Sequence, residues 1–518
     1  MIFHVILLLL PNGRQTKCRG EQMNFRKQQI VFVIFVAIVF SAVGFYGGFT
    51  LTKEEPTVEQ NEPNNNNEED KNNNESGSDN NNNQTTEKPK NLDKVFQAFD
   101  LIKEHYLEEI EDGELIEGAI QGMLGTLEDP YSSYMDDEAT NRFTEQIESS
   151  FEGIGAEVSM VNGKVTIVAP IKDSPAEAVG LRPNDRIIKI DQESIDGLDL
   201  NEAVEKIRGE RGTEVVLEIE RDGTSENFEV TLIRDKIPIE TVFASIEEVD
   251  GKKTGVLELT TFSQTTADEF FTELDKMEEE GIDGLVIDVR GNPGGLLNSI
   301  EDILRQFIPK DIPYIQTEDR TGEPVPFYSD LDEKKDYPIS VLIDEGSASA
   351  SEILAVAMKE VGYDVVGTPS FGKGTVQNAM PMGDNSTLKL TVYKWLSPEG
   401  NWIHDVGVEP TVEKKQPEYY YSNPIQVKDS YEFDDNDPQI ANIQVMLNGI
   451  GYETDREDGY FDESTEIAVK KLQEDNDLDV TGVIDEDTAG IIETSVIERI
   501  REGKDDLQLE EALKVLYE

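Results

Sequence analysis

Cysteine and histidine are almost missing from this chain of 518 residues. Its single cysteine, Cys18, excludes an intramolecular disulfide framework and a cysteine-rich zinc site. A catalytic triad of serine, histidine and aspartate needs an imidazole as its general base, and the chain offers only His4, His105 and His404. The sequence therefore predicts neither a metal site nor a cofactor, and a histidine-based triad is a poor expectation.

Cationic residues are also scarce. Lysine and arginine total 46 against 108 aspartates and glutamates, which gives a formal net charge of −62. This balance argues against a nucleic-acid partner, because phosphate backbones are bound by cationic grooves. The acidic residues are spread along the whole chain, which favours solubility in salt or beside a polyanionic cell wall over one specific acidic site.

One apolar stretch is long enough to cross a bilayer as a helix. Residues 30–49 contain no charge over the length that a transmembrane helix needs. Arg26 and Lys27 precede the stretch and two glutamates follow it, which predicts that residues 1–29 are cytoplasmic and that the rest lies outside the cell membrane. A cleaved signal peptide is the alternative, although the stretch is longer than the usual apolar part of one.

The composition changes twice after this stretch. Residues 50–90 are rich in asparagine and acidic residues and nearly without apolar ones, so they are expected to be a disordered linker. Residues 91–150 carry apolar side chains at helical spacing. This spacing predicts a helical N-terminal segment whose apolar faces form either a core or a homodimer interface.

Two further domains follow from the periodicity. Residues 151–235 hold short β-branched runs around one amphipathic helix, which predicts a small β domain. Residues 236–415 alternate strands with helices, which predicts an α/β domain that binds ligands at the carboxyl ends of its strands. The expected strands of this domain are 255–259, 285–289, 341–344 and 365–367, and its expected helices are 267–280, 297–308 and 351–361.

A glycine-rich turn follows the second of these strands. It reads Arg290-Gly-Asn-Pro-Gly-Gly295 and leads into a helix. Such a turn exposes backbone N–H groups and the positive end of the helix, which makes Gly294 and Gly295 candidates for holding an oxyanion. A nucleotide phosphate could occupy a similar turn, but the signatures of phosphate-binding loops are missing. A purely structural tight turn is the other alternative.

The third strand leads to a cluster of small residues, Gly346-Ser-Ala-Ser-Ala-Ser-Glu352. This cluster places a serine at the start of a helix, where the helix N-terminus favours developing negative charge and the alanines leave room for a carbonyl. Ser347, Ser349 and Ser351 compete for the role of nucleophile on spacing alone. A serine in this position is more often a simple helix cap.

Lys373 lies between two glycines in an apolar, β-rich stretch. A lysine can activate a serine in place of histidine when burial lowers its pKa, which is about 10.4 for the free side chain. Gln377 lies four positions later, so an extended chain would place it on the same face and let it orient the amine. An ordinary surface lysine is the alternative.

These motifs resemble those of the carboxyl-terminal processing peptidases, also called tail-specific proteases, over residues 90–415. The resemblance implies a PDZ module joined to an α/β peptidase core that uses a serine–lysine dyad. In that pattern Ser349 is the nucleophile, Lys373 is the base and Gln377 orients the base.

The same resemblance assigns a role to the glycine turn. Residues 290–295 match the Arg-x-Asn-x-Gly-Gly pattern of the family, so Gly294 and Gly295 are implied to line the oxyanion hole together with the Ala350 amide. His404 lies in a segment that resembles a closing strand of the family's core. It is therefore expected in packing and not in chemistry.

The β domain carries its own resemblance. The loop Phe151-Glu-Gly-Ile-Gly155 and the segment 174–188 resemble PDZ domains of the kind found in proteases. A glycine loop can present N–H groups to a peptide carboxylate while a strand edge pairs with the peptide backbone. Gly153, Ile154 and Gly155 are therefore expected to bind peptide tails, unless this is a generic small β domain.

Arg182 belongs to the second PDZ-like segment. The resemblance to the family implies that this arginine couples peptide binding to the active site. The alternative, a solvated surface arginine, is equally compatible with the sequence.

Residues 437–497 resemble the small helical peptidoglycan-binding domain of cell-wall enzymes. The resemblance rests on the order and spacing of short motifs, among them Asp458-Gly-Tyr-Phe-Asp462 and Val480-Thr-Gly-Val483. Residues 416–436 are expected to be a linker and residues 498–518 a C-terminal tail. A plain three-helix bundle that does not bind peptidoglycan is the alternative.

The sequence as a whole predicts a multidomain α/β protein with a transmembrane helix, a helical segment, a PDZ-like β domain, a peptidase core and a small helical peptidoglycan-binding domain. The expected function is that of a membrane-anchored serine endopeptidase that recognises and cleaves the C-terminal tails of extracytoplasmic proteins. The rival hypothesis is a catalytically silent scaffold that binds peptide tails while tethered to membrane and cell wall.

Overall fold

The computed structural model describes residues 92–161, 163–224, 226–427 and 430–518. The chain divides into two units, Met1–Leu107 and Glu108–Glu518. Helix α2 (Asp93–His105) is the described element of the first unit, and none of its residues is buried. The predicted membrane span and linker, residues 30–90, lie outside the described residues. Within the described ranges, no helix is both long and apolar enough to span a membrane.

Residues 108–150 of the second unit are not all helical. They form α3 (Asp112–Gly125), the short strand β1 (Ser133–Met135) and α4 (Asp137–Glu148). β1 pairs with β18 (Thr387–Leu396), a strand that follows it by some 250 positions in the sequence. The segment expected to be purely helical therefore contributes a strand to the α/β domain.

The strand-rich domain, residues 151–235, is a small sheet with two short helices. Its elements are β2 (Ser150–Gly153), β3 (Ala156–Val161), β4 (Lys164–Pro170), α5 (Pro175–Ala178), β5 (Arg186–Ile190), β6 (Glu193–Ser194), α6 (Leu200–Ile207), β7 (Glu214–Glu220), β8 (Phe228–Ile233) and β9 (Asp235–Pro238). The sheet order is β3–β4–β5–β7–β8 with β6 beside β5, while β2 pairs with β9. The inward-facing aliphatic side chains, such as Val215, Leu217 and Ile219 at every second position of β7, form its core.

The α/β domain contains two sheets. The elements of the larger one and its helices are β10 (Val242–Val249), β11 (Lys252–Leu259), α7 (Thr266–Glu280), β12 (Gly284–Asp288), α8 (Leu297–Leu304), β15 (Ile339–Ile343), α9 (Ala350–Glu360), β16 (Asp364–Gly367) and β19 (Val412–Glu413). This six-stranded sheet has the order β10–β11–β12–β15–β16–β19, and all its pairs are parallel except the one at the β10 edge. The second sheet joins β1 and β18 to β13 (Pro313–Glu318), β14 (Pro324–Tyr328) and β17 (Thr375–Pro381).

Both faces of the six-stranded sheet are covered, which explains why its central strands read as uninterrupted apolar runs. Leu285 and Ile287 of β12 belong to the main core with residues of α7, α8 and α9. Val286, between them, points to the opposite face and belongs to a second, smaller core. Residues near the C-terminus supply the cover on that face.

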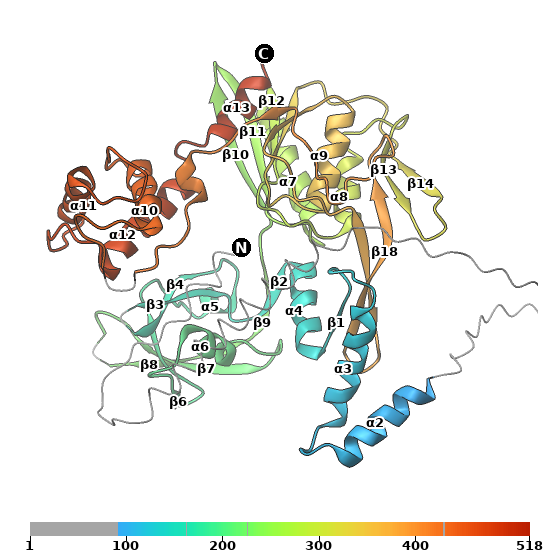
Figure 1. Ribbon diagram of the computed structural model, residues 1–518, viewed down its shortest axis with the longest axis horizontal. Coiled ribbons are helices and arrows are strands. Elements are labelled where there is room, and N and C mark those ends of the chain that lie inside the picture. Colours follow the sequence, from blue (N-terminus) through green and yellow to red (C-terminus); the bar gives the residue numbers. More distant parts are fainter. Residues whose placement is uncertain (1–91, 162, 225, 428–429) are drawn as a thin grey trace, which may run out of the picture. The chain divides into compact units, whose positions relative to one another are not determined.

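The residues expected to form a C-terminal tail complete the α/β domain instead. α13 (Leu507–Val515) lies against β15 and β16, and Figure 1 shows it beside β11 and β12 of the same sheet. Its apolar side is buried against the outward-facing side chains of four neighbouring strands, and the members of this second core are Val256, Val286, Leu342, Val366, Ala512, Leu513 and Leu516. The Tyr517 hydroxyl adds a hydrogen bond of 2.6 Å to the Thr254 hydroxyl on β11. The prediction of a C-terminal tail was therefore wrong, because nothing in the local sequence of this short helix indicates that it packs on the distant six-stranded sheet.

The helical domain lies between β19 and α13 in the sequence. It consists of α10 (Pro438–Gly449), α11 (Glu463–Asp475) and α12 (Glu486–Arg501), each of which begins after an aspartate whose side chain accepts a hydrogen bond from the first turn. In the expected linker, the 3-10 helix η2 (Glu418–Tyr421) adds Tyr419 to the core of this domain. The helical domain is thus inserted between two elements of the α/β domain.

Replacing Leu513 by alanine should destabilise the α/β domain, because the change opens a cavity under the six-stranded sheet. We expect a loss of roughly 2–5 kcal/mol in the free energy of unfolding. The two tryptophans of the chain, Trp395 and Trp402, both lie in the α/β domain, so their fluorescence during urea unfolding reports this domain alone.

Leu472→Ala is the matched control, since Leu472 is equally apolar and fully buried in the helical domain. It should lower the unfolding transition seen by far-ultraviolet circular dichroism and leave the tryptophan transition in place. An unchanged tryptophan transition in Leu513→Ala would show that α13 is an independent tail.

Candidate active site

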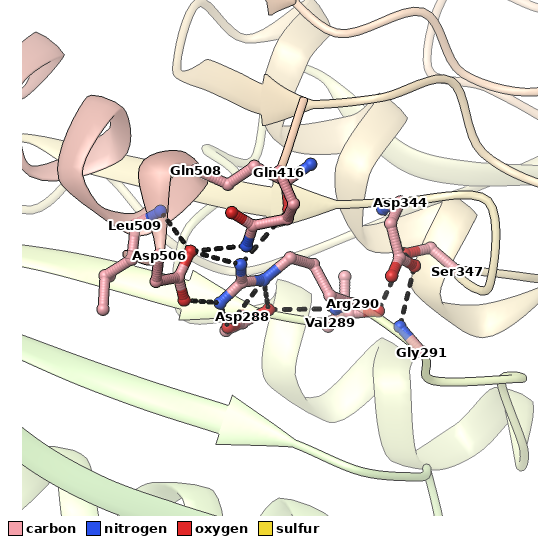
Figure 2. Close-up of polar contacts among 10 residues, drawn as sticks. All are labelled: Asp288, Val289, Arg290, Gly291, Asp344, Ser347, Gln416, Asp506, Gln508 and Leu509. Atoms are coloured by element: carbon pink, nitrogen blue, oxygen red, sulfur yellow. Dashed lines mark hydrogen bonds and ion pairs between the residues drawn. The ribbon is translucent and has the colours of Figure 1, made fainter. Parts of the chain in front are cut away.

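The glycine turn and the serine cluster lie at the same edge of the six-stranded sheet. β12 and β15 are parallel neighbours, so the residues that follow them leave the sheet side by side. The Asp344 carboxylate joins the two loops, because it accepts the Gly291 N–H at 2.7 Å and the Gly346 N–H at 2.9 Å. Figure 2 shows the Asp344 side chain beside Ser347 and directed toward Gly291. Burial raises the pKa of Asp344.

The structure separates the three competing serines. The Ser347 hydroxyl donates to the Val289 carbonyl at 2.8 Å, and the Ser351 hydroxyl donates to the Asn292 carbonyl at 2.9 Å. Both flanking serines are fully buried and hold the glycine turn. Ser349 is half-buried at the N-terminus of α9 with φ of 56° and ψ of −110°, a strained backbone for a residue with a side chain. Strain of this kind is found at nucleophile turns between strand and helix.

The glycine turn packs directly on Ser349. A Cβ atom on Gly294 would lie 2.8 Å from the Ser349 Cβ, and one on Gly295 would lie 2.0 Å from the Phe262 carbonyl oxygen. The Gly294 amide donates to Asn292 Oδ1 at 2.9 Å, so it is already used. In the described part of the chain, the amides of Gly295 and Ala350 donate no hydrogen bond. Two of the three expected oxyanion donors are therefore available.

Glu352 connects the serine to the lysine loop. Its side chain is fully buried. One carboxylate oxygen accepts from the Ser349 amide at 2.7 Å and the Lys373 amide at 2.8 Å. The other accepts from the Gly372 amide and the Ser370 hydroxyl, both at 2.6 Å. Sequence reasoning missed this residue, although a serine followed three positions later by glutamate is a known helix-start signal.

Lys373 lies in a setting that lowers its pKa. Among the described residues its amine forms no ion pair with a carboxylate, and its Nζ atom is 5.1 Å from the centre of the Tyr131 ring, a cation–π contact that acts against the shift. Burial and the nearby Lys389 lower the pKa of Lys373, while the charges of Glu352 and Asp129 act in the opposite direction. Tyr131 comes from the segment before β1, which the sequence did not connect with the site.

The structure does not bring all expected partners to the lysine. The Gln377 side chain donates to the hydroxyls of Thr375 and Thr391, at 3.0 and 3.1 Å. Among the described residues, no hydrogen bond joins Gln377 to Lys373, and none joins the Ser349 hydroxyl to the Lys373 amine. The predicted residues share one region without forming a closed chain of hydrogen bonds.

His404 lies beside the lysine loop, in a turn and not in the expected strand. Its Nδ1 atom accepts the Gly374 N–H at 3.2 Å, and its ring stacks on Trp402 with 5.0 Å between ring centres. In the described structure no contact joins its ring to Ser349. This geometry agrees with a packing role.

The predicted peptide loop is fixed by its carbonyl groups. Gly153, Ile154 and Gly155 are all buried, and the Ile154 side chain belongs to the core of the strand-rich domain. The Gly155 carbonyl accepts from the Ser174 hydroxyl at 2.9 Å, and the Ile154 carbonyl accepts from the Ala176 amide at 2.8 Å. These bonds anchor the loop to the start of α5.

Arg182 is exposed on the strand-rich domain. Its backbone amide donates to the Asp185 carboxylate at 2.8 Å, and that carboxylate pairs with Arg221 at 2.6 Å. The side chain of Arg182 lines a hollow with other basic residues of the same domain. In the described part of the chain, no bond links it to Ser349 or Lys373.

Four family models match the chain. The model of peptidase family S41 matches residues 253–414, and the PDZ domain model matches residues 153–232. The model of the N-terminal domain of the activating protease CtpB matches residues 38–139, and a peptidoglycan binding domain matches residues 436–492. The matches fall on the α/β domain, the strand-rich domain, the N-terminal segment and the helical domain.

Named proteins are similar over most of the chain. The carboxy-terminal processing protease CtpB of Bacillus subtilis (strain 168) is 51% identical over 433 residues, which cover 83% of this chain and 90% of that protein. The carboxy-terminal processing protease CtpA of the same organism is 38% identical over 425 residues, which cover 82% of this chain and 90% of that protein. Among solved structures, a photosystem II D1 C-terminal processing protease aligns with a TM-score of 0.38 at 24% identity, covering 62% of this chain and 92% of that one.

The family models and the similarity to CtpB confirm the resemblance that the motifs suggested. The strand-rich domain is a PDZ domain, and the helical domain is of the peptidoglycan-binding type. The identity to CtpB extends through nearly its whole length. The chain belongs to peptidase family S41 and is a carboxy-terminal processing serine protease with a PDZ domain and a peptidoglycan-binding domain.

Proposed function

We propose that this protease cleaves peptide bonds with Ser349 as nucleophile and Lys373 as general base. The observation that carries the proposal is the buried Glu352 carboxylate, which binds the backbone amides of both residues. Ser347 and Ser351 support the glycine turn, so their hydroxyls are occupied. Lys373 has a lowered pKa, which favours the neutral amine that a base requires.

In the first step, the Ser349 oxygen bonds to the scissile carbonyl carbon while the Lys373 amine takes the serine proton. The oxyanion that forms accepts hydrogen bonds from the Gly295 and Ala350 amides and is stabilised by the N-terminus of α9. Gly294 allows this arrangement because it has no side chain and can pack directly against Ser349. The lysine then gives its proton to the leaving amine, and water releases the acyl group by the same route.

The dyad is not closed in this structure, since no hydrogen bond joins the serine hydroxyl to the lysine amine within the described residues. Catalytic hydrogen bonds often tighten only when substrate is bound. We infer that substrate binding closes the dyad. Gln377 then orients the lysine amine, for which its side chain must leave Thr375 and Thr391.

The first test replaces the two reacting residues. Ser349→Ala and Lys373→Ala should each lower kcat by roughly 10⁴-fold or more on a peptide substrate. Lys373→Arg should be as inactive as Lys373→Ala, because arginine keeps the charge but does not lose its proton near neutrality. Kinetics of peptide cleavage, with folding checked by tryptophan fluorescence, measure these effects.

Lys276→Arg makes the same substitution at an exposed lysine of α7 and should keep full activity. Near-normal turnover in Lys373→Arg would mean that the lysine only stabilises charge. A wild-type chain that binds peptide tails but cleaves none would instead support the alternative hypothesis of a catalytically silent scaffold.

We further propose that the PDZ domain selects substrates by a free C-terminal carboxylate. The loop at Gly153–Gly155 is anchored through its carbonyls to α5, a geometry that suits backbone N–H groups turned toward a ligand. Arg182 would then couple the binding of a peptide in the PDZ domain to the active site. Its exposed position within the PDZ domain leaves it accessible to a partner group.

Amidation of the substrate C-terminus should lower kcat/KM by about tenfold or more, because a neutral amide loses the charge that the N–H donors favour. Acetylation of the amino terminus of the same peptide is the control and should have little effect. The comparison needs only cleavage rates of the three peptides. Equal cleavage of the amidated and free-acid peptides would contradict selection by the carboxylate.

The proposed location is the outer side of the cell membrane, with a single-pass anchor at residues 30–49. The uncharged run and its flanking charges support the anchor, and the peptidoglycan-binding type of the helical domain supports a site beside the cell wall. Membrane fractionation of chains with and without residues 30–49 checks the anchor.

The exposed apolar side chains of α2 and α3 support a homodimer.

A further inference from the structure

Arg290, the first residue of the glycine turn, is held by two carboxylates from distant parts of the chain. Its guanidinium bonds to Asp288 at the end of β12, with Nε 2.9 Å from Oδ1. The same group bonds to Asp506, with Nη1 2.8 Å from Oδ1 and Nη2 2.9 Å from Oδ2. Figure 2 shows the arginine reaching across to Asp506, which caps the N-terminus of α13.

This ion-pair cluster is shielded from water. The side chains of Arg290, Asp288 and Asp506 are 17%, 9% and 13% exposed. Burial acts to lower the pKa of Arg290, but the two paired carboxylates outweigh it and raise the pKa, so the arginine stays charged. Fork-like pairing on both sides fixes the guanidinium plane, which a single lysine could not do.

The chain leaves the α/β domain and returns to it at this same point. Gln416, just after β19, donates to Asp506 Oδ1 at 2.6 Å. Gln508 accepts from Arg290 at 3.2 Å and donates to the Lys414 carbonyl at 2.9 Å. The peptidoglycan-binding domain lies between these two segments in the sequence. The returning connection therefore contacts Arg290 directly through Asp506 and Gln508, and the outgoing connection is bonded to these two residues.

The position of Arg290 bears on the reaction. Four residues separate it from Gly295, whose amide is a proposed oxyanion donor. The turn between them is anchored at Gly291 by Asp344 and at Asn292 by the Leu259 carbonyl. Arg290 is the anchor on the side of the turn that faces α13, and a small displacement of an oxyanion donor lowers the rate strongly.

We propose that Asp506 is a positioning residue for the oxyanion turn and acts through Arg290. The C-terminal helix is therefore part of the catalytic framework, although a whole domain separates it from the α/β domain in sequence. This inference rests on the proposed role of Gly295 and Ala350. It adds a residue that lies outside the S41 family match, which ends at residue 414.

The test is Asp506→Asn in the full chain. Asparagine can still cap α13 at the Leu509 amide and accept from Gln416, but it carries no charge for Arg290. We expect kcat to fall about tenfold while KM stays unchanged, since a misplaced oxyanion donor weakens transition-state binding. The rate of labelling by a serine-directed phosphonate should fall in parallel, because its phosphoryl oxygen takes the same donors.

Asp485→Asn is the matched control. Asp485 caps α12 in the peptidoglycan-binding domain in the same way, without an arginine partner among the described residues. This variant should keep full kcat. An equal loss of activity in both variants, or no loss in Asp506→Asn, would overturn the proposal.

Two further variants keep the test decisive. Arg290→Gln removes the group through which Asp506 acts. The double variant Arg290→Gln/Asp506→Asn should therefore have the same kcat as Arg290→Gln alone. A further fall in kcat of about tenfold in the double variant would overturn the proposal.

If Asp506→Asn fails to fold, Gln416→Ala provides the test, because it removes the hydrogen bond that Gln416 donates to the Asp506 carboxylate. This variant should lower kcat about threefold with KM unchanged. An unchanged kcat would count against the proposal.

The same labelling experiment reports on the proposed function separately. Mass spectrometry of the labelled wild-type protein should locate the phosphonate on Ser349. A label elsewhere would overturn the assignment of Ser349 as nucleophile. The kcat values of Asp506→Asn and Asp485→Asn would still test the role of Asp506.

Discussion

The buried carboxylate of Glu352 is the contact on which the candidate site depends. It accepts four hydrogen bonds and thereby fixes the start of α9 to the lysine loop. A negative charge this close to Lys373 favours the ammonium form, whereas the proposed reaction needs the amine. Burial of the lysine and the charge of Lys389 outweigh that effect and lower its pKa. The site therefore combines a rigid anionic anchor with a lysine whose pKa burial lowers.

The six-stranded sheet shows what local periodicity can and cannot indicate. The alternation of strands and helices predicted the α/β domain, and β12 and β15 end where the chemistry-bearing turns begin. The same strands are apolar on both faces, a pattern that requires two covers. The second cover, α13, lies beyond another domain in sequence, so no local pattern could identify it. Asp506 was missed for the same physical reason, since its partner Arg290 is more than 200 positions away.

Candidate site residues could be named where a motif matches the family pattern, and they stayed ambiguous where hydrogen bonding has to separate neighbouring serines. The sequence offered three serines, and only the three-dimensional bonding of Ser347 and Ser351 to the turn separates them from Ser349. Tyr131 packs on the lysine from a segment that the helical pattern around it concealed. The comparisons confirm the family and the PDZ and peptidoglycan-binding domains. Ser349, Lys373, Gln377 and Arg182 keep the status of predictions about individual roles.

The most direct test of a neutral lysine base is the pH dependence of phosphonate labelling. Labelling of Ser349 should rise with pH through an apparent pKa below the ordinary value for lysine, because the reactive form must have lost the lysine proton. His404→Phe should show the same profile, and Lys373→Arg should remain unlabelled across the range. A profile that titrates near the pKa of imidazole and disappears in His404→Phe would contradict the account.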